Sequence, residues 1–264
     1  NNFPESAVFA DKAAEDTFKA YIQTELFDAD ALAAVLADFP IPDVKITYQQ
    51  AEAEHKNWNE EWEKNYFQPL IIGDVTEHPR CVIAATFHKD VPQGDYNIRI
   101  NPQMSFGTGH HQTTAQMIDR ILTDDFKGKF VLDMGCGTGI LAILAKMRGA
   151  SQCVAVDYDE WCVNNTRDNI ALNEISDIMV VHGDASALKP LENIFDVIIA
   201  NINRNILLQD LDKYVASLRV GGTIYMSGFY MEDVFSLVEK GTMLGLSLVD
   251  VKQRDNWACL KMSR

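Results

Sequence analysis

The sequence lacks several features that would assign it to a membrane or secreted class. It has no run of about 18 or more apolar residues, so it predicts no transmembrane helix. Its first residues, Asn1-Asn2-Phe3-Pro4-Glu5, contain neither a basic segment nor an apolar core, so we expect no signal peptide. Basic residues are also few: 23 Lys and Arg stand against 38 Asp and Glu, a formal net charge of −15. Because nonspecific nucleic-acid binding depends on neutralising phosphates, this balance argues against direct DNA or RNA binding and suits a basic partner.

The cysteines are scattered and form no Cys-x-x-Cys pair; they are Cys81, Cys136, Cys153, Cys162 and Cys259. An odd number without paired spacing argues against a disulfide framework and against a thiolate zinc site. His110 and His111 are adjacent, so their side chains diverge on a helix, and no His-x-x-x-His spacing completes a metal site. We therefore expect no metal and a cytoplasmic protein.

The first part of the chain reads as a small module of mixed elements. Thr17–Ile22 and Val44–Tyr48 alternate apolar and polar residues, as half-buried strands do. Asp28 is predicted to cap a helix that carries Leu32 on its apolar face. We expect residues 1–50 to form a small N-terminal α+β domain that lacks its first elements.

Residues 51–68 predict a linker helix. Trp58, Trp62 and Tyr66 are spaced four residues apart, so they form one aromatic stripe on this helix. Their neighbours are acidic, which disfavours the stacking of nucleic-acid bases on the stripe. We expect the stripe to pack against a domain, and Pro69 to end the helix.

Residues 69–264 alternate strands with helices, which predicts an α/β domain. Apolar runs such as Val197–Ala200 suit strands buried on both faces of a parallel sheet. Two strands in succession, Leu246–Lys252 and Trp257–Lys261, predict an antiparallel hairpin at the end of the sheet. Gly221-Gly222 is expected to form a turn before a strand. The fold class is therefore α/β, with a mostly parallel Rossmann-like sheet and an antiparallel last strand.

The clearest local motif is a glycine loop between a strand and a helix. Gly135, Gly137 and Gly139 allow a ligand to approach the backbone, and the N-terminus of the next helix points at it. Asp157 ends the following strand, where a carboxylate accepts both hydroxyls of a ribose. The other interpretation of Asp157 is a helix N-cap.

The spacing of the glycines bears on the cofactor. A dinucleotide fingerprint would place its third glycine at position 140, which is Ile140. The compact spacing instead resembles the loop of class I methyltransferases, whose cofactor S-adenosylmethionine (SAM) has no phosphate. That class often places a polar contact to the adenine at the end of the third strand, where Asp184 stands. Asp184 equally suits a turn.

Three motifs together resemble one methyltransferase family. They are Phe106-Gly-Thr-Gly-His-His-Gln-Thr-Thr114, Asp133-Met-Gly-Cys-Gly-Thr-Gly-Ile-Leu-Ala-Ile143 and Ala200-Asn-Ile202. These segments are similar to those of the ribosomal protein methyltransferase A family, and the resemblance extends from about Trp58 to the end. That family methylates amines on protein eleven of the large ribosomal subunit. The resemblance implies a class I methyltransferase fold, with SAM as methyl donor and S-adenosylhomocysteine (SAH) as product. It also implies that the small N-terminal domain recognises the ribosomal protein and that, in this chain, it lacks the family's first strand and helix.

The resemblance also implies the site residues. The methionine end of SAM would be covered by the loop that contains Phe106 and Thr108. The remaining cofactor contacts would come from Thr114, Gly135, Gly137, Asp157, Asp184 and Asn201.

Asn201 is the candidate catalytic residue. The segment Asn201-Ile-Asn-Arg204 lacks the prolines and the aromatic residue that orient planar nitrogens in Asn-Pro-Pro methyltransferases, so a flexible aliphatic amine fits better. A lysine amine, with a pKa of about 10.4, must lose a proton before it attacks, and desolvation favours that loss. We found no general base in the sequence and expect the Asn201 carbonyl oxygen to accept amine hydrogens. Its other interpretation is a turn residue.

The sequence thus predicts a monomeric protein-lysine N-methyltransferase. Its expected substrate is large-subunit ribosomal protein eleven, a basic protein, methylated several times on lysines and on N-terminal amines. One alternative keeps the cofactor but uses another protein or a small amine as acceptor. The alternative from a different class is a Rossmann nucleotide-binding protein, either an NAD-type enzyme or a non-catalytic sensor.

Overall fold

The computed structural model describes residues 27–37, 68–73, 78–101, 112–189 and 191–264. The chain divides into two units, Asn1–Trp58 and Asn59–Arg264, and each is described by itself. The strands predicted at 17–22 and 44–48 and the linker helix predicted at 51–66 lie outside the described residues. Phe106 and Thr108 also lie outside them.

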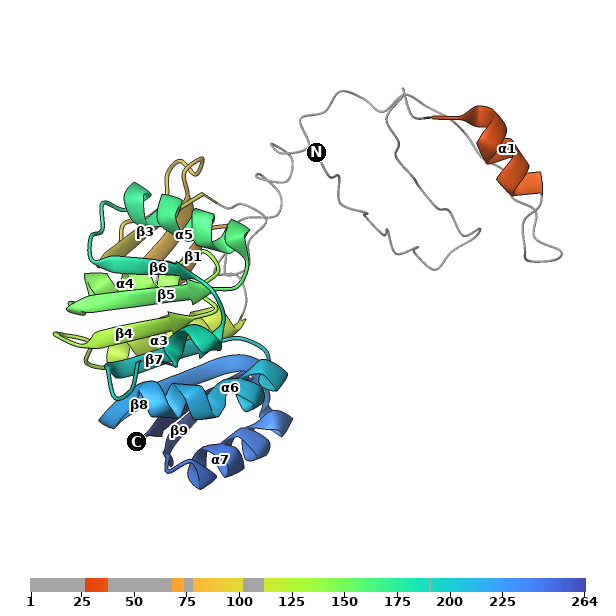
Figure 1. Ribbon diagram of the computed structural model, residues 1–264. Coiled ribbons are helices and arrows are strands. Elements are labelled where there is room, and N and C mark those ends of the chain that lie inside the picture. Colours follow the sequence, from red (N-terminus) through yellow and green to blue (C-terminus); the bar gives the residue numbers. More distant parts are fainter. Residues whose placement is uncertain (1–26, 38–67, 74–77, 102–111, 190) are drawn as a thin grey trace. The chain divides into compact units, whose positions relative to one another are not determined.

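In the first unit, the described helix is α1 (Ala29–Ala37) (Figure 1). Asp28 caps it as predicted, because its Oδ1 accepts hydrogen bonds from the backbone nitrogens of Asp30 at 3.0 Å and Ala31 at 2.9 Å. Leu32 is half-buried. The predicted helix is therefore confirmed in type and starting point.

The second unit is built on a seven-stranded sheet of order β6-β5-β4-β7-β8-β10-β9. Neighbouring strands from β6 to β8 run parallel, while β10 is antiparallel to both β8 and β9. This confirms the mostly parallel sheet with an antiparallel hairpin at its end. The strands are β4 (Phe130–Met134), β5 (Gln152–Asp157), β6 (Ile178–His182), β7 (Phe195–Asn201), β8 (Leu218–Tyr230), β9 (Ser247–Arg254) and β10 (Trp257–Ser263).

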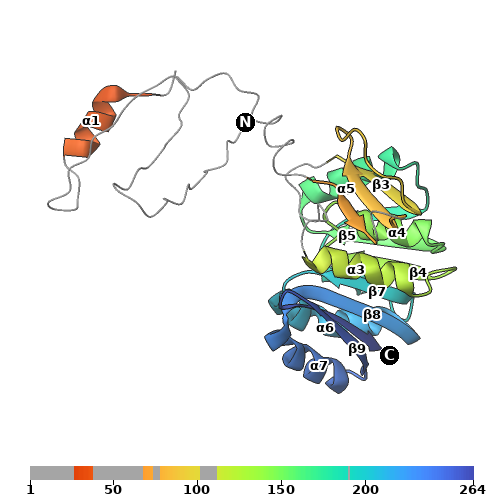
Figure 2. The same cartoon turned by 180° about the vertical axis from the view of Figure 1, so that it is seen from behind.

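Helices cover both faces of this sheet, and each face buries its own apolar cluster. One face carries α3 (Gln112–Thr123), α4 (Ile140–Met147) and α5 (Glu160–Leu172); Figure 2 shows α3 and α4 across it. The other face carries α6 (Arg204–Ser217) and α7 (Val234–Met243), with the short 3-10 helices η2 (Ala185–Leu188) and η3 (Met231–Asp233). This double covering explains why the central strands are apolar throughout.

A second, three-stranded sheet packs on the outer side of the helices α4 and α5. It contains β1 (Leu70–Ile72), β2 (Cys81–Ala85) and β3 (Tyr96–Ile100), with β1 antiparallel and β3 parallel to β2. Its end is held to α5: Asn165 Nδ2 donates to the Asn101 carbonyl, and Asn169 Oδ1 accepts from the Asn101 backbone nitrogen. The carboxyl end of β3 is thereby fixed beside α5.

The turn predicted at Gly221-Gly222 is wrong, because both glycines lie within β8. The register of β8 against β7 shifts between Leu218 and Thr223, so these residues bulge rather than reverse the chain. Arg264 pairs with both glycines through backbone hydrogen bonds, and the β10 pairing therefore extends β8 beyond the predicted start.

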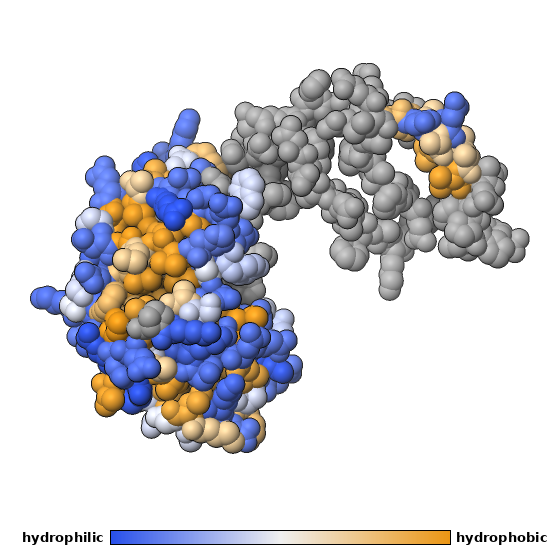
Figure 3. All heavy atoms as spheres, viewed as in Figure 1, coloured by the Kyte–Doolittle hydropathy of each residue, from blue (hydrophilic) through white to orange (hydrophobic). Residues whose placement is uncertain are grey.

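On the face seen in Figure 3, apolar side chains come to the surface in the area of the edge strand β6. Met179 of β6 is 64% exposed. In its described residues, the crossover from β6 to β7 contains only the short 3-10 helix η2, which covers little of this face. No helix in the described ranges is long and apolar enough to cross a membrane.

Candidate active site

The glycine loop lies where the parallel strands end. The backbone nitrogens of Gly135 and Cys136 donate to the Val156 carbonyl of β5 at 2.8 Å and 3.1 Å. Gly137 donates its backbone N–H to Asp157 Oδ2 at 2.9 Å. The structure therefore joins the loop after β4 to the acid at the end of β5, as the edge of a parallel sheet requires.

Helix α5 fixes the same loop from the other side. Thr166 donates its hydroxyl to the Gly137 carbonyl, and Asn169 donates to the Thr138 carbonyl, each at 2.9 Å. A Cβ on Gly139 would lie only 2.7 Å from Thr166 Cγ2, so the loop approaches the helix closely. We did not predict this support from the sequence. No sequence signal marks it, because the full burial of Thr166 and Asn169 depends on how α5 packs.

Asp157 ends β5, is 6% exposed and points toward the loop. Its second oxygen accepts from the Asp159 backbone nitrogen at 3.0 Å. The N-cap of α5 is Asp159, whose side chain accepts from the Trp161 nitrogen. The helix N-cap interpretation of Asp157 is therefore wrong, and the ribose contact stays a prediction.

Asp184 follows β6 and is exposed. Its Oδ1 accepts from the Ser186 backbone nitrogen at 2.7 Å, which makes it the N-cap of η2. The hydrogen bonds from Ser186 also lower the pKa of the Asp184 carboxyl. The turn interpretation is confirmed, while the adenine contact stays a prediction.

Asn201 ends β7, and its Nδ2 donates to the Thr114 hydroxyl of α3 at 3.3 Å. Thr114 is 2% exposed, so this bond fixes the amide against a rigid helix. Asn201 Oδ1 is buried and has no hydrogen-bond partner within the described part of the chain. The structure thus brings together two predicted site residues and leaves one amide oxygen available to a ligand.

Ile202 is wedged between the glycine loop and β8. A Cβ on Gly135, whose φ is +72°, would lie 2.2 Å from Ile202 Cγ2. A Cβ on Gly228, whose φ is +95°, would lie 2.4 Å from the Ile202 carbonyl oxygen. Only glycine fits at both positions, and together they place Asn201 beside the loop.

Asp133 is a buried carboxyl to which the sequence assigned no role. Its Oδ2 accepts from the Ala142 backbone nitrogen in the first turn of α4, while Oδ1 has no partner among the described residues. Burial raises the pKa of this carboxyl to about 7, and the nearby Asp157 carboxylate acts in the same direction. The sequence signal was an acid inside an otherwise apolar strand.

Cys136 lies in the loop but is buried, and its thiol contacts the Thr166 hydroxyl at 3.4 Å. Burial raises the pKa of this thiol well above its usual value, which disfavours the reactive thiolate. This agrees with a packing role for Cys136.

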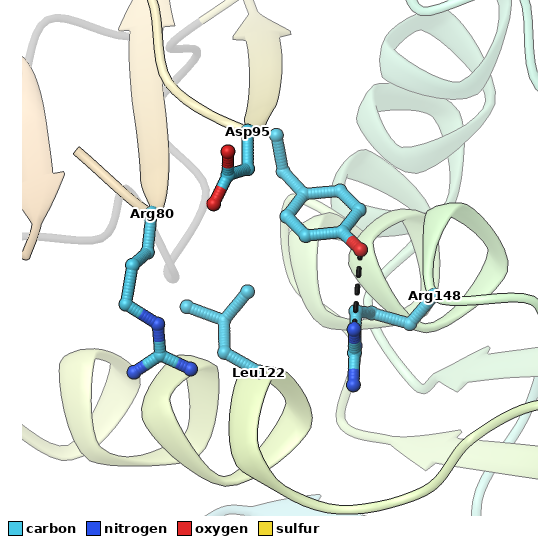
Figure 4. A pocket seen from close by; sticks show the side chains of 5 residues that line it. Arg80, Asp95, Leu122 and Arg148 are labelled. Carbon is cyan, nitrogen blue, oxygen red and sulfur yellow. Dashed lines mark hydrogen bonds between the residues drawn. The ribbon is translucent and has the colours of Figure 1, made fainter. Parts of the chain in front are cut away.

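A cavity of about 370 Å³ is lined by Arg80, Asp95, Tyr96, Leu122 and Arg148 (Figure 4). It lies away from the glycine loop, because Arg148 follows the end of α4, whereas the loop leads into the start of that helix. Arg148 is engaged by the Tyr96 hydroxyl and by the carbonyls of Ile121 and Asp124. The cavity is therefore separate from the glycine loop, and Arg148 has a structural role in it. In the described ranges, no group of three or more His, Cys, Asp or Glu could hold a metal ion.

A profile of the protein family described as "Ribosomal protein L11 methyltransferase (PrmA)" matches residues 3–264. The chain belongs to the PrmA family. This confirms the family expected from the motifs, and with it a methyltransferase.

Curated relatives agree with this membership. The ribosomal protein L11 methyltransferase of Phocaeicola vulgatus is 57% identical over 247 residues, which are 94% of this chain and 86% of that protein. The enzyme of the same name from Porphyromonas gingivalis is 47% identical over 249 residues, covering 94% of this chain and 84% of the relative.

Solved structures confirm the fold. The ribosomal protein L11 methylase of Lactobacillus delbrueckii subsp. bulgaricus superimposes with a TM-score of 0.63 at 28% identity, covering 70% of this chain and 95% of that chain. The methyltransferase SMU.776, solved in complex with SAH, has a TM-score of 0.51 at 15% identity, covering 58% of this chain and 50% of that chain. At that identity it supports the fold alone.

Proposed function

We propose that this protein is a SAM-dependent methyltransferase that transfers methyl groups to lysine amines of ribosomal protein L11. The observation that carries the proposal is the buried, unpartnered Asn201 Oδ1 beside the glycine loop. Family membership and the names of the relatives support the substrate.

The residues at the loop fit SAM better than a dinucleotide. Asp157 places a carboxyl at the loop, and the first turn of α4 after Gly139 is Ile140-Leu-Ala, without a basic side chain. An acidic side chain without a basic neighbour disfavours a diphosphate and suits a cofactor that carries ribose hydroxyls and positive charge. This argues against the NAD-type alternative. Asp157 would hold the ribose, and the backbone of Gly135 and Gly137 would lie against the cofactor.

When bound, SAM supplies a methyl group on a cationic sulfonium that accepts an electron pair. Asn201 Oδ1 accepts an N–H of the acceptor amine and aims the nitrogen lone pair along the line of transfer. Thr114 holds the amide in place, because its hydroxyl accepts from Asn201 Nδ2. Asn201 and Thr114 together thus orient the acceptor.

The acceptor amine must be neutral when it attacks. A lysine in water has a pKa of about 10.4, and burial of the amine beside apolar groups such as Ile202 lowers it. An amide oxygen is too weak a base to remove the proton, so Asn201 orients the amine and desolvation favours its neutral form. Water would carry the proton away before the substrate is fully enclosed.

The finer assignments belong to the same proposal. Residues 1–50 would recognise L11, residues 51–68 would link this domain to the catalytic domain of residues 69–264, and Phe106 and Thr108 would cover the cofactor. The protein would act as a monomer in the cytoplasm, where its ribosomal substrate is made.

Two titrations and one incubation test the function. Calorimetry is expected to detect binding of SAH and none of NAD. Purified L11 incubated with the protein and SAM is expected to gain mass in whole methyl units. Tight SAH binding without any gain in the mass of L11 would support the cofactor but contradict L11 as substrate. Binding of NAD would contradict the assignment to the methyltransferases.

A further inference from the structure

Two aromatic side chains stand at the same sheet edge as Asn201. Tyr230 ends β8 and Trp257 begins β10, and the two residues are paired across the strands. Their ring centroids are 4.2 Å apart with an interplanar angle of 34°. Tyr230 is 42% exposed, and Trp257 is half-buried. The pair therefore offers an accessible aromatic surface at the carboxyl end of the sheet.

Helix α3 ties this pair to the candidate catalytic residue. Thr114 accepts from Asn201 Nδ2, and two residues further on Gln116 Nε2 donates to the Trp257 carbonyl at 3.1 Å. In addition, Asn201 pairs with Ser227 of β8, three residues before Tyr230. Both the helix and the strand register thus place the aromatic pair on the strands next to Asn201, at the same edge of the sheet.

The backbone around the pair is held by several hydrogen bonds. The Tyr230 nitrogen donates to Asp233 Oδ2 at 3.1 Å, and the Met231 nitrogen donates to the Asn256 carbonyl at 2.9 Å. Asp233 also forms an ion pair with Arg204 at 2.9 Å. The partly exposed Tyr230 is therefore part of an ordered surface, which is the condition for recognition at low entropic cost.

Asn201 alone cannot bind the acceptor nitrogen in all of its methylation states. Each added methyl group removes one N–H that Asn201 Oδ1 could accept, and a trimethylated nitrogen has none left. The product nitrogen keeps its positive charge, however, and an aromatic face attracts such a cation without needing an N–H. The same face also packs against the four-carbon stem of lysine.

We propose that Tyr230 and Trp257 form the lysine-binding wall of the methyl-transfer site. The wall contacts the alkyl stem of the acceptor and holds its ammonium before deprotonation and after each methyl transfer. This inference rests on the proposed function and deepens it by naming the residues that hold the acceptor side chain.

The test uses the full chain with Tyr230→Leu, Trp257→Leu and the double variant, and L11 as substrate. We expect KM for L11 to rise about fivefold to twentyfold in the double variant, which is the range of a cation–π contact. We expect kcat for the first methylation to change less than about threefold, since Asn201 is intact, and the trimethylated share of the product to fall. SAH affinity, measured by calorimetry, is expected to stay unchanged.

Two further variants are matched controls. Trp257→Phe keeps an aromatic face and is expected to restore most of the KM. Phe235→Leu removes an aromatic residue that is 76% exposed on α7, and it is expected to leave KM unchanged. If Trp257→Leu misfolds and loses SAH binding, the KM of Tyr230→Leu tests the proposal instead, because replacing this partly exposed side chain disturbs the fold less.

A pair of small inhibitors tests the role of charge. Nα-acetyl-Nε-trimethyl-lysine methylamide is compared with its neutral analogue, in which carbon replaces the quaternary nitrogen. The cation is expected to bind the wild-type protein more tightly in calorimetry, and the difference is expected to vanish in the double variant. Equal KM for L11 in the wild type and the double variant, or equal binding of both inhibitors to the wild type, would contradict the proposed lysine-binding wall. If the wild type leaves L11 unmodified, the proposed function is wrong, and the inhibitor titrations still test whether the wall binds a cation.

Discussion

Asn201 connects the cofactor loop to the acceptor side of the proposed site, because its neighbour Ile202 touches Gly135 while its amide reaches Thr114. The amide oxygen is buried and has no protein partner in the described ranges. A buried acceptor without a partner costs free energy, so a substrate N–H is the natural group to satisfy it. The residue is therefore the most direct point at which to test the chemistry.

Replacing Asn201 with Ala is expected to lower kcat about 100-fold, since misplacement of a reacting nitrogen by about 1 Å has an effect of that size. SAH affinity should change less than about threefold. Steady-state kinetics and calorimetry measure the two quantities. Asn203→Ala is the control: Asn203 caps α6 through the Ile206 nitrogen, so its loss should reduce stability by about 1 kcal/mol and leave kcat intact. Unchanged kcat in Asn201→Ala would contradict the proposed role of Asn201 in orienting the acceptor amine.

Asp133 predicts a pH dependence of stability. Its folded pKa of about 7 lies above the unfolded value of about 3.9, so folding favours the protonated form. The stabilising contribution is thus fully present below about pH 4 and is lost as the pH rises to about 7. Relative to Asp133→Asn, the wild type should lose unfolding free energy across this range, by at most about 1.4 kcal/mol per pH unit, and then level off. Urea unfolding of both proteins from pH 5 to about pH 8 measures this difference, and a constant difference would contradict the assignment.

Single residues could be predicted where a local pattern carries the information. Asp157 and Asn201 were identified because they follow apolar strands in a parallel sheet, and the structure places both at the same edge. The hydrogen bonds from Thr166 and Asn169 to the glycine loop were not predicted, because they join residues about thirty positions apart. Contacts of this kind depend on how α5 packs, which no local pattern reports.

At the scale of elements, Gly135 and Gly228 allow the loop after β4 and the strand β8 to pack closely against Ile202. Gly228→Ala is expected to reduce the free energy of unfolding by more than about 2 kcal/mol, because left-handed strain adds to a 2.4 Å contact with the Ile202 carbonyl. It should also lower kcat, since Ile202 adjoins Asn201. Urea unfolding and kinetics measure both effects.

Gly221→Ala is the matched control in the same strand. Its φ of +80° imposes similar strain, but a Cβ there meets nothing within 4 Å. We expect a loss of about 1 kcal/mol and normal kcat. Equal effects of the two substitutions would contradict the close approach at Gly228.

The elements themselves were largely predictable, and the exceptions have a tertiary cause. The alternation of strands and helices predicted for residues 69–264 is confirmed, as in β4 and α5, because apolar strands and amphipathic helices are marked by local patterns. β8 starts earlier than predicted, at Leu218, because Arg264, which follows β10, forms backbone hydrogen bonds with Gly221 and Gly222 and stabilises extended backbone there. The Gly-Gly sequence has a high propensity for a turn, but hydrogen bonding to the neighbouring segment determines the conformation there.

At the scale of the whole molecule, the net charge of −15 favours the approach of a basic ribosomal protein. We therefore expect kcat/KM for L11 to fall several-fold as KCl rises from about 0.05 M to about 0.5 M, because the Debye length shortens from more than about 10 Å to a few Å. SAH affinity should change little over the same range, which separates substrate attraction from general salt effects. A kcat/KM independent of salt would show that charge does not guide the encounter.

The central claim is that the carboxyl ends of β4, β5 and β7 form a site that methylates L11. The most direct measurement incubates the wild type and Asn201→Ala with labelled SAM and a mixture of ribosomal proteins, then locates the label by mass spectrometry. The account predicts label on lysines of L11 with the wild type and a loss of about 100-fold with the variant. Label on another protein, or equal labelling of L11 by both forms, would contradict it.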